Sequence, residues 1–472
     1  MRVADARRSV PGEGRDVLSS RGSGEKVLVA NRGEVALRVV RACRELGLPS
    51  VAVFSEADES ALHVNEADEA VNLGPAPAAK SYLNIERVLS AARETGATLV
   101  HPGYGFLSER ADFARACEAE DGLSFVGPSA EAMGRLGDKA EARRLAREAG
   151  VPVVPGTDGV ASPGEAVGAA EEVGYPVMIK AAAGGGGRGI RVAKDEEELK
   201  KLVREAKREA EAAFGDGSLY LERFLADPRH VEVQVIADSR GNAAHLFERE
   251  CSMQRSRQKV LEEAPSAALS PETRRRMCEA ALSLVETSGY VNAGTVEFLV
   301  EGSGPEEEFF FIEMNTRIQV EHPVTEMLTG VDLVKEQLRV ALGEPLGFGQ
   351  DDLAINGHAI EFRINAEDPD QSFLPSPGTV SDLRLPGGPG VRVDSALYAG
   401  YTVPPFYDSL VGKLIVWGRD REEAIARSRR ALGEYHIEGI KTTVGLHLRL
   451  LDDKSFLAGD YGTSYLETLL SG

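Results

Sequence analysis

The chain has 472 residues, 42% of them hydrophobic and 27% charged, which is typical of a globular protein with several domains. Its formal net charge of −21 argues against a nucleic-acid-binding surface, and no apolar run in the sequence is long enough to cross a bilayer. The cysteines are widely scattered without a CxxC spacing, so we expect a protein of the reducing cytoplasm with no structural zinc.

Residues 1–24 are rich in arginine, serine and glycine, which fits either an organellar transit peptide or a disordered tail. They contain no apolar segment of the kind found in secretory signals. Asp5, Glu13 and Asp16 also count against a transit peptide, so we expect a disordered N-terminal tail.

Apolar strands alternate with helical segments after this tail, which predicts a doubly wound α/β domain. The sequence lacks a dinucleotide-binding fingerprint there, because Asn31-Arg32-Gly33 follows the first strand where G-x-G-x-x-G is required. The expected strands are residues 26–30, 50–54, 98–101 and 124–126.

Two side chains near this domain could contact a ligand. Tyr104 follows the strand at 98–101 and lies either on a ligand-binding loop at the carboxyl edge of the sheet or in a simple turn. Asp138 can cap a helix and place Lys139 in its first turn, where the positive helix end disfavours a cation unless an anion shares the site. The alternative for Lys139 is a solvated side chain.

A glycine-rich run separates a strand that ends at Lys180 from a second strand at 190–192. Walker A and Rossmann loops run into a helix, so the order of strand, loop and strand excludes both. Gly185, Gly186 and Gly187 leave backbone N–H groups free to approach phosphate oxygens, and Lys180 adds a positive charge. The run therefore predicts a mobile phosphate-binding flap rather than a plain linker.

A strand at 229–236 is followed by a stretch dense in charge. The strand places three polar side chains on one face: His230, Glu232 and Gln234. Downstream, Arg255, Arg257 and Lys259 gather positive charge beside acidic residues. This stretch is either a solvated charge run or an anion pocket.

Two apolar segments, 294–300 and 309–315, flank a turn-rich stretch and predict a β-hairpin. A turn centred on residues 304–305 places Glu297 opposite Glu313, where two bare carboxylates repel by about 3 kcal/mol. Carboxylate and amide oxygens suit Mg²⁺, so these residues with Asn315 predict a metal site. The alternative is a pair of strand acids that face solvent. Polar side chains continue on alternate positions through Arg317, Gln319 and Glu321, although we expect the strand itself to end after Asn315.

Together these motifs resemble the ATP-grasp enzymes, and more closely biotin carboxylase, over about residues 25–468. The resemblance implies α/β and α+β elements in an ATP-grasp fold. It implies a Rossmann-like N-terminal domain at 25–134, an ATP-grasp domain at 135–345 with a lid at about 155–224, and a strand-rich C-terminal domain at 346–468. The motifs that carry it are 31–34, 101–109, 133–139, 180–189, 229–234, 251–259, 313–325 and 363–369.

The resemblance also implies roles for single residues. Glu321 is the expected general base, and Arg363 stabilises the biotin enolate with Tyr104 beside the biotin ring. Two Mg²⁺ or Mn²⁺ ions accompany ATP on Glu297, Glu313 and Asn315. Bicarbonate is expected on Lys259, Arg317, Gln319, Val320 and Glu321, with Lys259 and Arg317 also acting in catalysis. ATP is expected on Lys139, Lys180, Gly185, Gly186, Gly187, Glu222, Arg223, Leu225, His230, Gln254, Glu297 and Glu313.

The sequence departs from the pattern of the family at three positions. Arg257 stands where a histidine is common, Arg223 replaces a lysine beside the adenine hinge, and Ala183 replaces a glycine that begins the loop in some relatives.

Biotin is expected as a substrate carried by another chain, because the sequence contains no Ala-Met-Lys-Met biotinylation motif and no carrier or carboxyltransferase region. The expected assembly is a homodimer that works with a biotin carboxyl carrier protein and carboxyltransferase subunits of acetyl-CoA carboxylase, in fatty-acid synthesis. Propionyl-CoA and pyruvate carboxylases share this component. The other hypotheses are a different ATP-grasp ligase and a non-catalytic nucleotide-binding protein.

Overall fold

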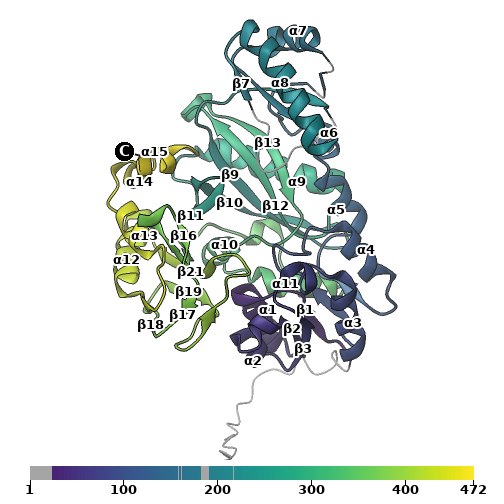
Figure 1. Cartoon of the computed structure of the whole chain (residues 1–472), viewed down its shortest axis with the longest axis vertical. Helices are drawn as coiled ribbons and strands as arrows, with labels where there is room; N and C mark the ends of the chain where they lie inside the picture. The colour runs from purple at the N-terminus through teal and green to yellow at the C-terminus, as the bar shows by residue number, and fades with distance from the viewer. Residues whose placement is uncertain (1–23, 158, 161, 182–190, 216, 472) are drawn as a thin grey trace, which may run out of the picture.

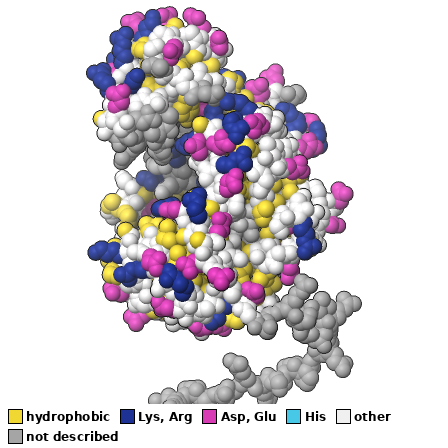
Figure 2. All heavy atoms as spheres, turned by 90° about the vertical axis from the view of Figure 1, so that its right-hand side faces the viewer, with side chains coloured by type: hydrophobic (Ala, Val, Ile, Leu, Met, Phe, Trp, Pro, Cys, Tyr) yellow, Lys and Arg dark blue, Asp and Glu magenta, His cyan; other side chains and the backbone are white. Residues whose placement is uncertain are grey.

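The computed structural model describes residues 24–157, 159–160, 162–181, 191–215 and 217–471 (Figure 1). Residues 1–23 of the predicted tail lie outside these ranges, as do Ala183 and the loop glycines Gly185, Gly186 and Gly187. Among the described helices, none is long and apolar enough to span a membrane. On the face drawn in Figure 2, basic and acidic side chains are interspersed over the upper lobe and the body, so the net negative charge is not gathered there in one patch.

The N-terminal part is a parallel sheet of five strands in the order β3-β2-β1-β4-β5, which confirms the predicted α/β domain. Alternate residues of β1 point to opposite faces: Leu28 packs toward α3 and α4, whereas Val27 and Val29 pack toward α1 and α11. The strands are β1 (Val27–Val29), β2 (Ser50–Ser55), β3 (Glu69–Gly74), β4 (Leu99–His101) and β5 (Ser124–Phe125). The helices are α1 (Gly33–Leu46), α2 (Leu62–Glu66), α3 (Ile85–Thr95), α4 (Ala111–Ala119) and α5 (Ala130–Gly137).

The strand order reverses between β1 and β4, so the chain segments that leave these strands open a crevice at the carboxyl edge of the sheet. Asn31 to Glu34 follow β1, and Tyr104 follows β4. The Asn31 amide donates to the carbonyl oxygens of Pro102 and Tyr104, both at 2.7 Å, and so ties the two segments together. Tyr104 therefore lies on a loop at the edge where open α/β sheets bind ligands.

A small lobe stands above the rest of the molecule in Figure 1 and consists of a three-stranded sheet covered by two helices. The strand that ends near Lys180 pairs antiparallel with the strand after the glycine run, as the sequence predicts. Leu199 and Val203 of α8 pack with Ile179 and Leu221 of the sheet. The elements are α7 (Pro163–Val173), β6 (Val177–Ala181), β7 (Arg191–Ala193), α8 (Glu196–Phe214) and β8 (Leu219–Arg223), in the sheet order β7-β6-β8.

The centre of the molecule is an antiparallel sheet of eight strands in the order β13-β12-β9-β10-β11-β14-β21-β19. Because β11 pairs with β14, this sheet continues into the C-terminal region. Helix α9 packs on it through Met277 and Leu284, which contact a core that includes Phe298 and Phe311. The strands are β9 (Arg229–Ala237), β10 (Ala243–Arg255), β11 (Gln258–Ala264), β12 (Asn292–Glu301), β13 (Glu308–Asn315), β14 (His358–Asn365), β19 (Val391–Ser395) and β21 (Leu410–Gly418).

The predicted hairpin is β12 and β13, and its register pairs Glu297 with Glu313. After Asn315 the chain leaves the sheet and passes through an irregular segment to α10, whose N-cap residue is Glu321. The predicted end of the strand at Asn315 is therefore confirmed. The alternating polar residues beyond it lie on a loop.

The remaining helices pack around the central sheet and the parallel sheet. Helix α12 covers β14 and β21, and three shorter helices follow it in the chain. These helices are α6 (Lys139–Glu148), α9 (Pro271–Ser288), α10 (His322–Thr329), α11 (Leu333–Ala341), α12 (Arg421–Glu434), α13 (Val444–Leu450), α14 (Lys454–Ala458) and α15 (Tyr465–Ser471). The short strands are β15 (Glu367–Asp368), β16 (Leu374–Pro375), β17 (Gly378–Thr379), β18 (Asp382–Arg384), β20 (Thr402–Val403) and β22 (His436–Glu438).

Phe298 tests the packing of the central sheet. Its side chain is fully buried and meets the Phe309 ring edge to face, with ring centroids 5.5 Å apart. We expect Phe298→Ala to lower the free energy of unfolding by about 3 to 5 kcal/mol, because the substitution leaves a cavity in the core. Phe406→Ala, at a side chain that is 52% exposed, is the control and should change stability by less than about 0.5 kcal/mol. Equal losses for the two variants in urea denaturation would contradict this packing.

Candidate active site

A cavity of about 1060 Å³ lies where the three parts of the chain meet. The segments after β1 and β4 line one side, the small lobe contributes β6 and β8, and the central sheet supplies the floor. The lining includes residues as far apart in sequence as Asn31 and Ser464. Among the described residues of the predicted site, those that line this cavity are Tyr104, Lys139, Lys180, Glu222, Arg223, Leu225, His230, Gln254, Lys259, Glu297, Glu313, Asn315, Arg317, Gln319, Val320 and Arg363.

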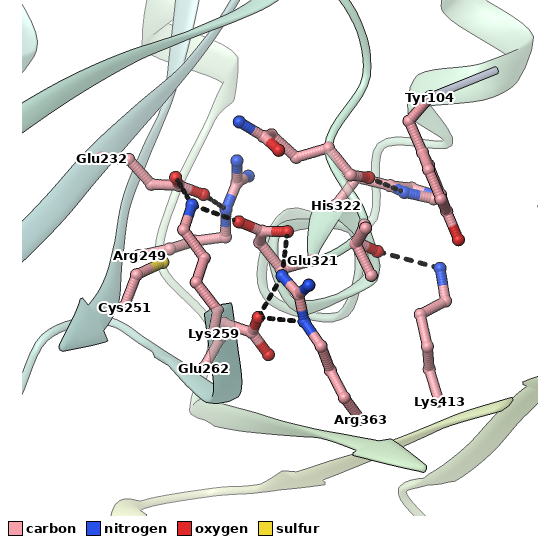
Figure 3. Close-up of polar contacts among 12 residues, drawn as sticks. Tyr104, Glu232, Arg249, Cys251, Lys259, Glu262, Glu321, His322, Arg363 and Lys413 are labelled. Atoms are coloured by element: carbon pink, nitrogen blue, oxygen red, sulfur yellow. Dashed lines mark hydrogen bonds and ion pairs between the residues drawn. The ribbon is translucent and has the colours of Figure 1, made fainter. Parts of the chain in front are cut away.

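The ammonium group of Lys259 forms the centre of the polar floor. It donates to Glu232 Oε2 at 2.5 Å and to Glu321 Oε1 at 2.6 Å, and it lies 3.3 Å from Glu297 Oε1. The second oxygen of Glu321 accepts from Arg363 at 2.9 Å. Figure 3 shows Lys259 and Arg363 both directed at Glu321. Glu321 does not line the cavity and is fully buried, so these two cations separate its carboxylate from the cavity surface.

The charges in this cluster determine which groups are ionised. Burial alone would raise the pKa of Glu321, but Lys259, Arg363 and Arg249 hold it well below its ordinary value. Burial opposes the charge of Lys259 too, yet the surrounding acidic groups raise the pKa of its ammonium well above the ordinary value. Glu321 is therefore an ionised carboxylate, which can accept a proton, and Lys259 is a cation.

The loop after Asn315 folds back onto the same carboxylates. Arg317 donates to Gln319 Oε1 at 2.7 Å and to Asn315 Oδ1 at 3.0 Å. The side-chain amides of Asn315 and Gln319 donate to Glu297 Oε1 at 2.8 and 3.2 Å. Arg317 also pairs with Glu109 at 3.2 Å. These contacts hold two N–H donors, those of Arg317 and Gln319, at the wall of the cavity beside a lysine cation.

Glu297 and Glu313 form the cross-strand pair expected for a metal site. Glu297 is buried and pairs with His230 at 2.9 Å, whereas no ion pair or hydrogen bond is described for the Glu313 carboxylate. Burial and the neighbouring Glu297 charge raise the pKa of Glu313. A divalent cation would relieve this repulsion, and the oxygen donors of Glu297, Glu313 and Asn315 are of the kind that Mg²⁺ prefers. Solvent-facing strand acids are excluded, because Glu297 is only 6% exposed.

The remaining candidate nucleotide residues that the structure describes also line the cavity. Lys180 pairs with the buried carboxylate of Glu222 from the neighbouring strand. Lys139 is exposed in the first turn of α6, and the Asp138 side chain accepts from the Glu141 backbone N–H at 2.9 Å, so the predicted cap is confirmed. Gln254 lies 2.6 Å from His230 Nδ1. Three side chains of phosphate-binding type, those of Lys139, Lys180 and His230, thus line the same cavity as the carboxylates of Glu297 and Glu313.

Family models match three consecutive parts of the chain. Residues 23–133 match the biotin carboxylase N-terminal domain, residues 138–348 the ATP binding domain of the carbamoyl-phosphate synthase L chain, and residues 361–468 the biotin carboxylase C-terminal domain. Biotin carboxylase 1 of Bacillus subtilis (strain 168) is 54% identical over 445 residues, which span 94% of this chain and 98% of that protein. The chain belongs to the biotin carboxylase family.

Two further relatives, whose names give a pyruvate carboxylase and a 2-oxoglutarate carboxylase, have similar identity. A pyruvate carboxylase component of Methanothermobacter thermautotrophicus is 53% identical over 448 residues, spanning 95% of this chain and 90% of the relative. The biotin carboxylase domain dimer of Hydrogenobacter thermophilus 2-oxoglutarate carboxylase, solved with MgADP, ADP and bicarbonate, has a TM-score of 0.85 and 50% identity, covering 94% of this chain and 97% of that chain. This likeness confirms the ATP-grasp fold, and the chain is an ATP-dependent ligase of the biotin carboxylase family.

The predicted basic cluster divides in two. Lys259 reaches the carboxylates, whereas Arg255 stacks on Phe373, with the guanidinium carbon 3.9 Å from the ring centroid. Arg257 is exposed at the turn between β10 and β11 and lines the outer part of the cavity. Of the three residues, Lys259 is therefore the one that lies among the carboxylates of the floor.

Several buried charges around this site are not among the residues that the sequence motifs predict. Lys413 is fully buried, donates to the Val320 carbonyl at 2.9 Å and lies 3.2 Å from Glu34 Oε1, which accepts from the Tyr104 hydroxyl. Arg249 holds Glu232 at 2.7 Å. The sequence does indicate a role for Lys413, because it is the single charged residue in the apolar run of 410–417. A lysine inside a buried strand usually has a charged or polar partner.

Glu262 provides a pH-dependent test of the cluster. Burial raises its pKa to about 7, although the Arg363 guanidinium at 2.6 Å opposes this shift. A carboxyl group with a raised folded-state pKa contributes stability below its unfolded-state pKa, and that contribution disappears as the pH rises through about 7. We therefore expect Glu262→Gln to gain stability relative to the unaltered protein, on the order of 1 to 3 kcal/mol, between about pH 5 and pH 8.

Urea denaturation across this pH range measures the difference. Asp238→Asn is the control, because hydrogen bonds from Asn242 and the Leu346 backbone outweigh burial and lower the pKa of Asp238. The contribution of Asp238 is lost only as the pH falls below about 3.8, so its effect should stay constant over the measured range. A constant effect for Glu262→Gln as well would show that Glu262 does not titrate near neutrality.

Proposed function

We propose that the chain uses ATP and bicarbonate to carboxylate biotin that is attached to a carrier protein, through the mixed anhydride carboxyphosphate. The observation that carries this proposal is the buried Glu321 carboxylate, which is shared by Lys259 and Arg363 on the floor of a cavity that also holds Lys180 and the Glu297–Glu313 pair. The anion pocket and the nucleotide pocket thus share one cavity, and the base lies directly behind the two cations at its floor. Phosphoryl transfer to a weak nucleophile requires all three.

In the first step, bicarbonate occupies the wall formed by Lys259, Arg317, Gln319 and the backbone of Val320. These donors orient the anion toward the nucleotide, and Glu321 accepts the proton of its hydroxyl group. The freed oxygen attacks the γ-phosphate, the bond to the β-phosphate oxygen breaks, and ADP leaves. Lys259 and Arg317 stabilise the negative charge that develops during the transfer.

The nucleotide is held by Lys139, Lys180 and His230, with Gln254 beside His230 and with the segment Glu222 to Leu225 along the adenine. Glu297, Glu313 and Asn315 would hold Mg²⁺ or Mn²⁺, as two ions with ATP, and such ions neutralise the phosphate charges. The Hydrogenobacter structure, which contains MgADP and bicarbonate together, supports this assignment.

In the second step, carboxyphosphate breaks its carbon–oxygen bond to give CO₂ and phosphate, and the phosphate removes the proton from the ureido nitrogen of biotin. The nitrogen then attacks CO₂. Arg363 lies 2.9 Å from Glu321 and faces the same cavity as Tyr104, so it can stabilise the ureido oxygen as an oxyanion. Exclusion of water matters, because carboxyphosphate hydrolyses readily.

The carrier and the final acceptor belong to partner proteins. We propose that this chain acts as a homodimer in acetyl-CoA carboxylase and so serves fatty-acid synthesis, with a biotin carboxyl carrier protein and carboxyltransferase subunits. The dimer of the Hydrogenobacter domain supports the assembly. Pyruvate and propionyl-CoA carboxylases remain the alternatives, the first supported by the Methanothermobacter relative.

Glu321→Gln tests the base directly. The substitution keeps the shape of the side chain but removes its ability to accept a proton, so bicarbonate-dependent and biotin-dependent ATP cleavage should fall by about 10² to 10⁴. ATP binding, measured by calorimetry, should remain within about threefold because Glu321 lies below the bicarbonate wall. Glu272→Gln, on the exposed side of α9, is the control. Full turnover in Glu321→Gln would refute the assignment.

Glu313→Gln tests the metal site. Because this carboxylate loses one full negative charge, the Mg²⁺ concentration for half-maximal activity at fixed ATP should rise by about tenfold or more. Glu308→Gln, at the exposed start of the same strand, should leave this concentration unchanged. An unaltered Mg²⁺ requirement in Glu313→Gln would remove Glu313 from the ligand set.

A further inference from the structure

Glu222 is a buried carboxylate that holds two cations at once. Its side chain is 7% exposed, and its two oxygens accept separately from Arg143 on α6 and from Lys180 on β6. The strand register explains the second contact, because Met178 lies opposite Glu222 and Lys180 opposite Tyr220, so that Lys180 and Glu222 are diagonal neighbours on one face of the sheet. One negative charge is therefore shared by two positive charges.

The two cations differ in how firmly they are held. Both cations lie near the Tyr220 ring, 5.9 Å from its centroid for Arg143 and 6.0 Å for Lys180, but the Arg143 guanidinium also donates to the Val154 carbonyl at 3.2 Å. For Lys180, the hydrogen bond described by the structure is the one to Glu222. Lys180 is also more exposed, at 26% against 13% for Arg143, and it lines the cavity whereas Arg143 does not. Arg143 is thus fixed behind Glu222, and Lys180 stands in front of it.

We propose that Arg143 is a positioning residue that keeps Glu222 paired when Lys180 moves from this carboxylate to the nucleotide phosphates. The inference rests on the proposed function, in which Lys180 contacts ATP. Phosphate oxygens compete with Glu222 for the Lys180 ammonium, and a buried carboxylate that lost its only cation would be strongly destabilised. With Arg143 present, the pair of Arg143 and Glu222 remains neutral after Lys180 has left.

Helix α6 is suited to supply this residue. Lys139 and Arg143 are four positions apart and therefore lie on the same side of the helix, one turn from each other. Lys139 lines the cavity from the first turn, and Arg143 reaches under it to Glu222. The neighbouring Arg144 points away and pairs with Glu141 and Glu148 at the surface. One helix therefore provides a cation that lines the cavity, Lys139, and the counter-ion of a carboxylate in the cavity wall, Glu222.

The phosphate part of nucleotide affinity tests this role. In the intact chain, calorimetry measures the dissociation constants of ADP and of adenosine. The adenosine constant divided by the ADP constant shows how much the phosphates contribute to affinity. We expect Arg143→Leu to reduce that ratio by about tenfold or more, because Glu222 then retains Lys180. Adenosine affinity should change by less than about threefold.

A second substitution distinguishes positioning from structure. Adding Glu222→Gln to Arg143→Leu removes the charge that retains Lys180, so the ratio should return to within about threefold of the unaltered protein. Arg143→Lys, which keeps a cation, should retain most of the ratio and gives a comparison should Arg143→Leu fold poorly. Arg144→Leu is the matched control and should leave the ratio unchanged.

Equal weakening of ADP and adenosine by Arg143→Leu would overturn the inference, as would a double variant no better than the single one. Either result would show that Arg143 only packs α6 against the lobe. Failure of the unaltered protein to bind ADP would overturn the proposed nucleotide site itself. The two failures are therefore distinguishable.

Discussion

The contact of one ammonium group with three carboxylates is the constraint on which the structure depends. Glu232, Glu297 and Glu321 come from β9, from β12 and from the N-cap position of α10, and without Lys259 of β11 they would repel one another at the floor of the cavity. At an effective dielectric constant of about 20, each close pair of like charges costs roughly 3 to 4 kcal/mol. The sheet order β12-β9-β10-β11 is the arrangement that gathers these acids around one lysine.

This arrangement also explains how a carboxylate can be ready for proton transfer while it is buried. Lys259 and Arg363 hold the pKa of Glu321 low, so the group is ionised before any ligand arrives. In the proposed reaction, bicarbonate enters as an anion and draws Lys259 toward itself. The base then loses part of its stabilisation and becomes a stronger proton acceptor at the moment when its substrate is in place. In the proposed role of Arg143, the same principle applies at Glu222: Arg143 keeps the carboxylate paired, so Lys180 can move to a phosphate.

Local patterns in the sequence predicted the parts of the site that lie close together in the chain. The turn at residues 304–305 fixed the register of Glu297 and Glu313, and Asp138 marked the start of α6. Strand β3 was missed, because it is a largely exposed edge strand that lacks a run of buried apolar residues. Other contacts could not be predicted in this way. Lys413 and Glu34 lie 379 residues apart in the chain, and no periodic pattern in the sequence relates Arg143 to Glu222. Such pairings follow from the order of strands, which hydrophobic periodicity does not encode.

The central claim is that a bicarbonate oxygen, freed by Glu321, attacks the γ-phosphate of ATP. Turnover with ¹⁸O-labelled bicarbonate, ATP and biotin, followed by mass spectrometry of the inorganic phosphate, tests it most directly. If carboxyphosphate forms, its carbon–oxygen bond breaks in the next step, and each phosphate released in biotin-dependent turnover carries one labelled oxygen. Phosphate without label, released at the same rate as carboxybiotin, would show that water rather than bicarbonate attacks ATP and would contradict the account.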